Sequence, residues 1–172
     1  MQYSIIPYNN ILPNIHKSVY IAQGARIIGD AIIEQNSSIW FNVVIRADVS
    51  KVNIGQATNI QDGTVIHASR YNGPTIIGSN VTVGHNATIH AVILKDYAFI
   101  GMNSVIMDKA IVREFGFVAA GALIAPGKIV GSYQLWAGIP AKYIRDITTS
   151  EIEMIQNSSS HYIELAQKYK SI

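Results

Sequence analysis

The stretch from Leu94 to Ile124 consists of LKDYAF, IGMNSV, IMDKAI, VREFGF, VAAGAL and a final I, with an aliphatic residue at every sixth position. A period of six fits neither an amphipathic helix, which repeats every 3.6 residues, nor the simple alternation of a half-buried strand. It is typical of a solenoid in which each hexapeptide forms one short strand and one corner. The sequence therefore predicts an all-β fold, a parallel β-helix.

The same period extends toward the N-terminus over most of the chain. Earlier aliphatic positions in this register are Ile15, Ile21, Ile27, Ile33, Ile39, Ile45, Ile54, Ile60, Ile66, Ile77, Val83 and Ile89. Four residues after most of them lies a small or β-branched residue, such as Ala25, Ser37 or Thr58. We expect the aliphatic residues to point inward and the small ones to fit at the crowded corners. A sandwich of β-branched strands is the alternative, and the near-constant register disfavours it.

The register is interrupted in three places. Three extra residues lie between Ile45 and Ile54, and five lie between Ile66 and Ile77, around Arg70. One residue is missing between Ile89 and the next repeat. Because insertions in a solenoid form loops on its flank, we expect a loop at each insertion.

The chain is expected to form an N-terminal segment (1–14), the hexapeptide-repeat solenoid (15–130), and a connecting segment with a C-terminal helix (131–172). The stretch 150–153 (Ser-Glu-Ile-Glu) has the pattern of a capping box at a helix start. The apolar stripe that would dock this helix on the solenoid consists of Ile152, Ile155, Ile163, Ala166 and Tyr169. The stretch 157–160 (Asn-Ser-Ser-Ser) predicts a break into two helical pieces.

Composition limits the class of protein. The 172 residues suit one domain, and only 14% are charged while 49% are hydrophobic, which predicts a large buried surface in a core, an oligomer interface, or both. A net charge of +2 with scattered basic residues argues against a nucleic-acid-binding patch. No apolar run approaches the roughly 18 residues of a membrane helix, and the first residues lack a signal-peptide pattern, so cytoplasm is the default expectation. The chain has no cysteine, so a metal would need histidines and carboxylates.

The repeat resembles that of hexapeptide-repeat proteins from about residue 15 to residue 128. That resemblance implies a left-handed coil with three faces per turn. On three faces, Arg46, His67 and His90 each follow a repeat start on the same face in consecutive coils. They should therefore stack about 4.8 Å apart and point outward.

Asp62 and His85 should stack in the same way on the preceding face, because each lies two positions after a repeat start. His67 and His90 can then share a metal within one chain, whereas His85 points in another direction. We expect the third ligand to come from a neighbouring subunit of a trimer. Three neutral imidazoles leave a fourth position open, which is the pattern of a catalytic zinc site.

An outward histidine on a solenoid is otherwise a solvated or interface residue. The pairing of His67 with His90 one coil apart favours the metal site over that alternative. His16 falls on a different face and is expected to be structural. His161 lies in the predicted C-terminal helix and is expected at the surface.

Several motifs together resemble the γ-class carbonic anhydrase family, in its compact, short-loop branch. The matching stretches are Arg46-Ala47-Asp48, Asn59-Ile60-Gln61-Asp62-Gly63, Val65-Ile66-His67, Gly84-His85 through His90, Ile100-Gly101-Met102 and Gly138-Ile139-Pro140-Ala141-Lys142. The resemblance implies reversible hydration of carbon dioxide to bicarbonate by a metal-bound hydroxide at the interface of a homotrimer. Zinc is the expected metal, although iron and cobalt accept the same ligands.

The resemblance also implies roles for individual residues. His67, His85 and His90 would bind the metal. Arg46 would pair with Asp62 across the subunit interface, and Asp48 would support the same network.

Two amides and a tyrosine complete the implied site. Gln61 would hydrogen-bond the metal-bound water or bicarbonate, with Asn59 close by. Tyr162 resembles a family tyrosine that lines the pocket from the C-terminal helix, and a packing role is the alternative.

The chain departs from the family pattern in its proton-transfer groups. The loop from Ala68 to Thr75 carries no carboxylate, and Val49 occupies the position of a family glutamate. We therefore expect weak or regulated activity. Two alternatives stay open: a hexapeptide-repeat acyltransferase that uses acyl-CoA, and a non-catalytic metal-binding scaffold protein.

Overall fold

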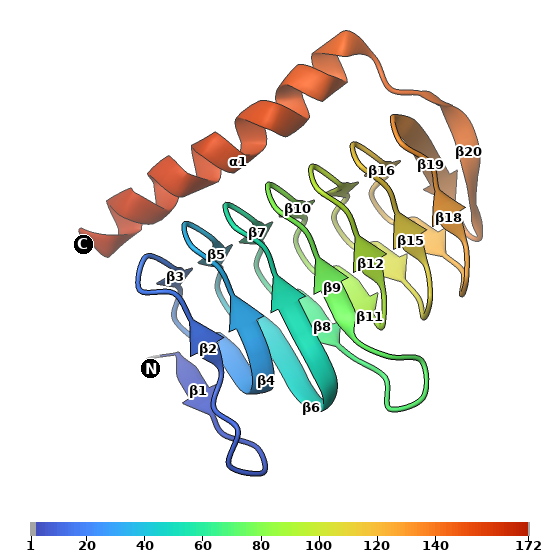
Figure 1. The fold of residues 1–172 in the computed structure, drawn as a ribbon. Helices are drawn as coiled ribbons and strands as arrows, with labels where there is room; N and C mark the ends of the chain where they lie inside the picture. The colour runs from blue at the N-terminus through green and yellow to red at the C-terminus, as the bar shows by residue number, and fades with distance from the viewer. Residues whose placement is uncertain (1–2, 172) are drawn as a thin grey trace.

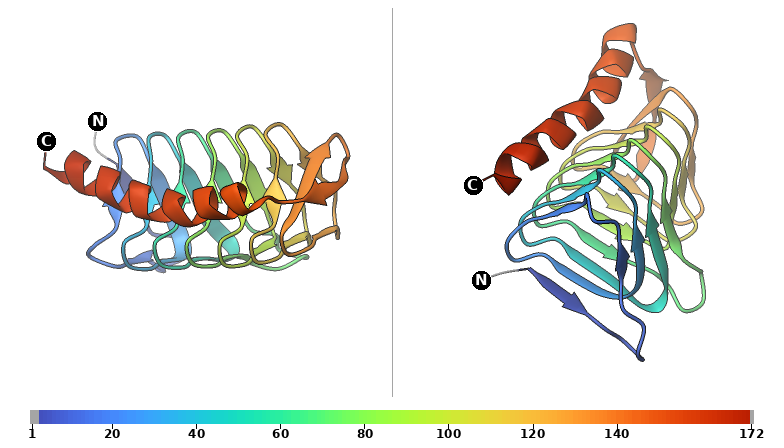
Figure 2. Two further views of the ribbon diagram at one scale, coloured as in Figure 1. Left: turned by 90° about the horizontal axis from the view of Figure 1, so that it is seen from above. Right: turned by 60° about the vertical axis from the view of Figure 1, so that its left-hand side comes forward.

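The computed structural model describes residues 3–171 and shows a parallel β-solenoid with one long C-terminal helix (Figure 1). Met1, Gln2 and Ile172, which belong to the expected terminal segments, lie outside the described residues. The coils are roughly triangular in cross-section and stack along one axis (Figure 2). The solenoid predicted from the hexapeptide period and the C-terminal helix predicted from its capping pattern and apolar stripe are both confirmed.

The strands form two sheets. The strands are β1 (Ser4–Ile6), β2 (Asn14–Ile15), β3 (Tyr20–Ile21), β4 (Arg26–Ile33), β5 (Ser38–Ile39), β6 (Val44–Ile54), β7 (Asn59–Ile60), β8 (Val65–His67), β9 (Thr75–Ile77), β10 (Thr82–Val83), β11 (Thr88–His90), β12 (Ile93–Leu94), β13 (Phe99–Ile100), β14 (Val105–Ile106), β15 (Ile111–Val112), β16 (Phe117–Val118), β17 (Leu123–Ile124), β18 (Ile129–Val130), β19 (Gln134–Gly138) and β20 (Ala141–Asp146). One face is an eight-stranded sheet in the order β20-β19-β16-β13-β10-β7-β5-β3. The other two faces form a twelve-stranded sheet, joined because β6 pairs with β8 at one end and with β9 at the other.

The core of the solenoid is built from the six-residue register. The inward aliphatic residues from Ile27 to Ile124 are at most 2% exposed, and the small residues at the corners, among them Ala25, Ser37 and Thr58, are buried with them. Ile45, Ile66 and Ile89 pair directly from coil to coil. Burial of one such side chain stabilises the fold by about 1.5–3 kcal/mol. The expected inward and corner positions are therefore confirmed.

The two insertions differ in their effect. The prediction of a loop between Ile45 and Ile54 is wrong, because β6 continues through this stretch as one long strand beside β4. A register shift after Gly29 absorbs the difference in length. Gly29 has φ +76°, and a Cβ there would lie 2.3 Å from the carbonyl oxygen of Ala47, so only glycine fits. The second insertion does form a loop, closed by backbone hydrogen bonds between Ser69 and Gly73.

The parallel ladder extends past both expected ends of the repeat. β1 pairs with β4, so the N-terminal segment begins the first coil. At the other end β19 pairs in parallel with β16, and β20 then turns back antiparallel to β19. The connecting segment therefore closes the solenoid with a hairpin.

The C-terminal helix α1 (Thr149–Lys170) is a single helix of 22 residues, so the predicted break at residues 157–160 is wrong. Ser159 is buried, and the hydroxyl of Ser158 lies 2.7 Å from that of Thr82 on β10. These serines are small enough for the helix to approach the sheet, and Ser158 finds a polar partner there. Packing against the solenoid therefore outweighs the low helix propensity of this stretch.

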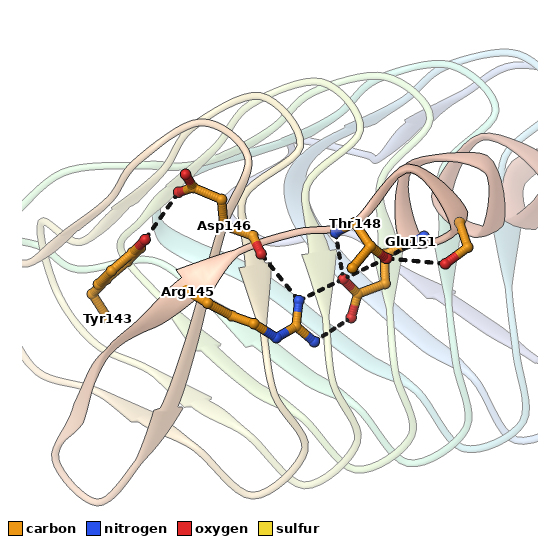
Figure 3. Close-up of polar contacts among 6 residues, drawn as sticks. Tyr143, Arg145, Asp146, Thr148 and Glu151 are labelled. Atoms are coloured by element: carbon orange, nitrogen blue, oxygen red, sulfur yellow. Dashed lines mark hydrogen bonds and ion pairs between the residues drawn. The ribbon is translucent and has the colours of Figure 1, made fainter.

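The helix begins two residues earlier than its sequence pattern indicated. Thr148 is the N-cap and forms a capping box with Glu151, so the capping box predicted from Ser150 is wrong in register. Arg145 donates two hydrogen bonds to the Glu151 carboxylate, at 2.8 and 2.9 Å (Figure 3). The hydrogen bonds from Arg145, followed by that from the Thr148 backbone, lower the pKa of Glu151 to about 2. The carboxylate ties the β20 strand to the start of the helix.

From this cap the helix runs back along the eight-stranded face toward the first coils (Figures 1 and 2). Near its end Tyr169 packs against Tyr20 and Trp40, with ring centroids 5.9 and 5.4 Å away. The helix therefore packs across successive coils of the solenoid. In the described part of the chain, no helix has the length and apolar character needed to cross a membrane.

Candidate metal centre

Three neighbouring strands place Arg46, His67 and His90 in one row. Arg46 on β6 pairs with His67 on β8, and His67 pairs with His90 on β11. The imidazole rings of the two histidines have their centroids 5.1 Å apart. The row predicted from the repeat register is therefore present in the structure.

The two histidines turn ring nitrogens toward each other. Nδ1 of His67 lies 3.1 Å from Nε2 of His90. On the outer sides, Nε2 of His67 lies 2.9 Å from a carboxylate oxygen of Asp48, and Nδ1 of His90 lies 2.5 Å from one of Asp108. Because an ionised carboxylate only accepts hydrogen bonds, each outer nitrogen carries the ring proton. When both rings are neutral, the two facing nitrogens therefore present lone pairs to the same point.

Both carboxylates are held in the ionised form. Burial alone would raise the pKa of Asp48, but hydrogen bonds from His67 and Arg46 and the charge of Arg46 lower it below its ordinary value. For Asp108, the effect of burial is likewise outweighed by hydrogen bonds from Asn72 and His90. Each aspartate therefore fixes the tautomer of the histidine it contacts.

Asp108 is absent from the residues that the sequence predicted for this site. It lies in the turn after β14, 18 residues beyond His90. The spacing of 18 residues could have pointed to Asp108, because residues about 18 positions apart stack in a three-sided hexapeptide coil. The missing residue before Leu94 obscured it by shortening this coil.

The facing nitrogens fit a zinc ion. Zinc–imidazole bonds of about 2.0–2.1 Å at a tetrahedral angle require two ligand nitrogens roughly 3.3 Å apart. The observed separation between His67 and His90 is 3.1 Å. Within the described residues of this one chain, no three histidine or acidic side chains are grouped so as to hold a metal.

His85 lies apart from the other two histidines. It occupies the turn between β10 and β11, a corner of the coil rather than the face expected. Its Nδ1 lies 2.8 Å from a carboxylate oxygen of Asp62, as expected from their stacking, and both side chains are 41% exposed. No hydrogen bond or ion pair found among residues 3–171 connects His85 with His67 or His90. The chain thus brings together two of the three predicted ligands and presents the third at an open corner.

Gln61 and Asn59 belong to a hydrogen-bonded chain that ends at the helix. The Gln61 amide donates to Asn59 at 3.0 Å, and Asn59 donates to the Thr82 hydroxyl at 2.9 Å. Gln61 and His85 line one pocket of about 250 Å³, whose wall is mainly apolar and includes Phe99. The amide that the sequence singled out therefore faces the same space as the exposed histidine.

Tyr162 on α1 is half-buried against Trp40, with ring centroids 5.5 Å apart. Burial, and then the negative charge of Asp62, raise the pKa of Tyr162. The tyrosine therefore packs under the helix as well as lying near the Asp62–His85 corner. Both expectations for it, a pocket residue and a packing residue, are compatible with this position.

Three further residues of the sequence analysis, Arg46, Asp62 and His16, have partners within the chain. Arg46 is paired with Asp48, and Asp62 with His85, so the Arg46–Asp62 pair expected between subunits stays a prediction. His16 contacts the hydroxyl of Ser18 at 2.8 Å, and His161 is exposed on α1.

Comparison with known proteins identifies relatives along almost the whole chain. No family model matches it. It is 42% identical over 168 residues to a carbonic anhydrase of Geobacillus kaustophilus, an alignment that covers 98% of this chain and 92% of the relative. It is also 42% identical over 164 residues to gamma carbonic anhydrase 2, mitochondrial, of Arabidopsis thaliana, which covers 92% of this chain. The chain spans 59% of the length of that plant relative.

Solved structures agree on the fold. A hexapeptide transferase family protein from Anaplasma phagocytophilum superposes with a TM-score of 0.93 at 46% sequence identity, covering 96% of this chain and 97% of that one. The names of the carbonic anhydrase relatives and the motifs around the histidines indicate the same family. The chain belongs to the γ-class carbonic anhydrase family.

Proposed function

We propose that this protein catalyses the reversible hydration of carbon dioxide to bicarbonate at a metal site between the subunits of a homotrimer. His67 and His90 of one subunit and His85 of the partner subunit would hold the ion. The observation that carries this proposal is the pair of ring nitrogens that face each other across 3.1 Å, with a carboxylate at the far side of each ring. Zinc suits three imidazoles best, and iron and cobalt accept the same donors.

A zinc ion on three histidines supplies the activation of water near pH 7. The chain's own residues would arrange the reactants around it. Asp48 and Asp108 hold the ring protons of His67 and His90 away from the ion. Gln61, oriented by Asn59, would donate a hydrogen bond to bicarbonate. The apolar wall of the adjoining pocket suits carbon dioxide, which has no net dipole and little need of polar partners.

Proton release is the slow step of the reaction that we propose. Each turnover produces a proton that must reach solvent. The loop from Ala68 to Thr75 offers no carboxylate, and Val49 cannot accept a proton. We therefore propose an anhydrase whose turnover is limited by proton transfer.

Two other functions have a supporting observation each. The pocket of about 250 Å³ beside His85, together with the transferase family name of the Anaplasma protein, supports an acyltransferase with His85 as its base. The lack of carboxylates in the loop supports a metal-binding scaffold protein without activity.

One experiment separates the three functions. Metal content per chain and carbon dioxide hydration are measured on the same anaerobically purified sample, together with binding of coenzyme A. Metal with hydration activity supports the anhydrase, and metal without activity supports the scaffold. Binding of coenzyme A without any metal overturns the three-histidine site and favours the acyltransferase.

A further inference from the structure

His90 is connected to the short loop through a chain of two hydrogen bonds. Asp108 accepts from Nδ1 of His90 through Oδ1 and from the side-chain amide of Asn72, at 2.7 Å, through Oδ2. Both oxygens of this carboxylate are thus engaged, and its side chain is 16% exposed. Asn72 lies in the loop between β8 and β9, which begins directly after His67.

We propose that Asp108 is a positioning residue for His90 and that Asn72 couples the loop to it. Asp108 holds the proton of His90 on Nδ1 and leaves Nε2 as the lone pair that faces His67. Asn72 fixes the second oxygen of Asp108, so the carboxylate cannot rotate away from the imidazole. This inference rests on the proposed metal site and assigns to the loop a role in metal affinity rather than in proton transfer.

A comparison of the two carboxylates, Asp48 and Asp108, supports this assignment. Asp48 is held by Arg46 from its own strand, whereas Asp108 is held by Asn72 from a loop. His67 is thus positioned from the rigid sheet, and His90 depends on an insertion in the repeat. A change in the loop should therefore act on His90 first.

The test measures zinc affinity by competition with a chelator and the tautomer of His90 by nitrogen NMR of the metal-free protein. Loss of a carboxylate that orients a ligand histidine typically weakens metal binding about 10- to 100-fold. We expect that loss for Asp108→Ala, a smaller loss for Asp108→Asn, which keeps an acceptor, and a loss of a few-fold for Asn72→Ala. Glu114→Ala, which removes an exposed carboxylate on another corner, should change neither quantity.

The NMR measurement keeps this inference separate from the proposed function. In the wild-type protein His90 should carry its proton on Nδ1, and Asp108→Asn should shift the tautomer population even if Asp108→Ala does not fold. If the wild-type protein itself does not bind zinc but the tautomer shifts as expected in the variants, the metal site fails and the positioning role stands. An Nε2–H tautomer in the wild type, or wild-type zinc affinity in both Asp108 variants, overturns the inference.

Discussion

At the scale of single residues, the site is organised by which nitrogen of each histidine keeps its proton. His67 and His90 each have one ring nitrogen in contact with a carboxylate and turn the other toward the partner histidine. His85 is held by Asp62 through Nδ1, which leaves its Nε2 free at an exposed corner. All three histidines therefore have a carboxylate on one side of the ring and turn the other nitrogen away from it, the arrangement common among metal-binding histidines.

His85→Ala should abolish metal binding although His85 contacts neither of the other two histidines in the chain. The reason is that two imidazoles leave a tetrahedral ion with too few protein ligands. Metal content by elemental analysis checks this, with His161→Ala as the control because His161 is an exposed histidine on α1. A trimer that still carries its metal after His85→Ala would rule out the shared site.

Turnover should rise with the concentration of imidazole buffer, by roughly tenfold or more, because a mobile base replaces the missing proton acceptor. Stopped-flow hydration assays at constant pH and ionic strength measure this dependence. The ratio kcat/KM for carbon dioxide should stay unchanged, since the buffer acts after the hydration step. A turnover independent of buffer would mean that the chain has a proton route of its own.

At the scale of elements, corners and caps decide the details. Many corners place a residue in the left-handed region, and asparagine is common there, for example Asn80 and Asn103. Phe115 also adopts φ +55°, and its ring stacks on those of Tyr97 and Tyr133, with centroids 4.8 and 5.1 Å apart. The stacking of bulky rings from coil to coil offsets the cost of a backbone conformation that such residues rarely adopt.

The cap of α1 makes stability depend on pH. Since the folded pKa of Glu151 is about 2, below its ordinary value near 4.5, the unfolded chain binds the proton more tightly. The stabilisation from Glu151 is therefore complete above about pH 4.5 and is lost as the pH falls toward 2. Glu151→Gln should lower the free energy of unfolding by roughly 1 kcal/mol at neutral pH.

Urea unfolding at several pH values measures this difference. The gap between wild type and Glu151→Gln should narrow from pH 5 to pH 3, as the unfolded wild-type chain takes up the proton while Glu151 in the folded protein stays ionised. Glu153→Gln, an exposed change in the same helical turn, is the control. An equal gap at every pH would show that the carboxylate charge at the cap does not contribute.

At the scale of the whole molecule, the three proposed metal ligands lie in two separate places. His67 and His90 lie on the face formed by β8 and β11, and His85 lies at the corner that precedes β11. Arg46 and Asp62 lie at the same two places and are both partly exposed. A partner subunit whose corner before β11 packs against the β8–β11 face of this chain would complete the proposed site. The same contact would bring the opposite charges of Arg46 and Asp62 together.

A double-mutant cycle on Arg46→Ala and Asp62→Ala tests this assembly. If the two residues pair between subunits, their effects on trimer dissociation should be non-additive, with a coupling of about 1.5 kcal/mol or more. Sedimentation over a range of protein concentrations provides the dissociation constants. A parallel cycle of Arg46 with Asp48 controls for the pair already present within one chain. Additive effects for Arg46 and Asp62 would show that the two residues do not interact across the subunit interface.

The hexapeptide period by itself determined the solenoid and its inward side chains, and with the three faces per turn implied by the resemblance it also predicted the row of Arg46, His67 and His90. These features are local and repeat from coil to coil, so the spacing along the chain is enough to predict which residues stack. Only the tertiary structure decided that Asp108 and Asn72 support His90 and that Ser159 lies buried under a single unbroken helix. Those contacts join segments whose offset depends on how a shortened coil, a loop and a docked helix settle against the stack, and no periodic pattern specifies that offset.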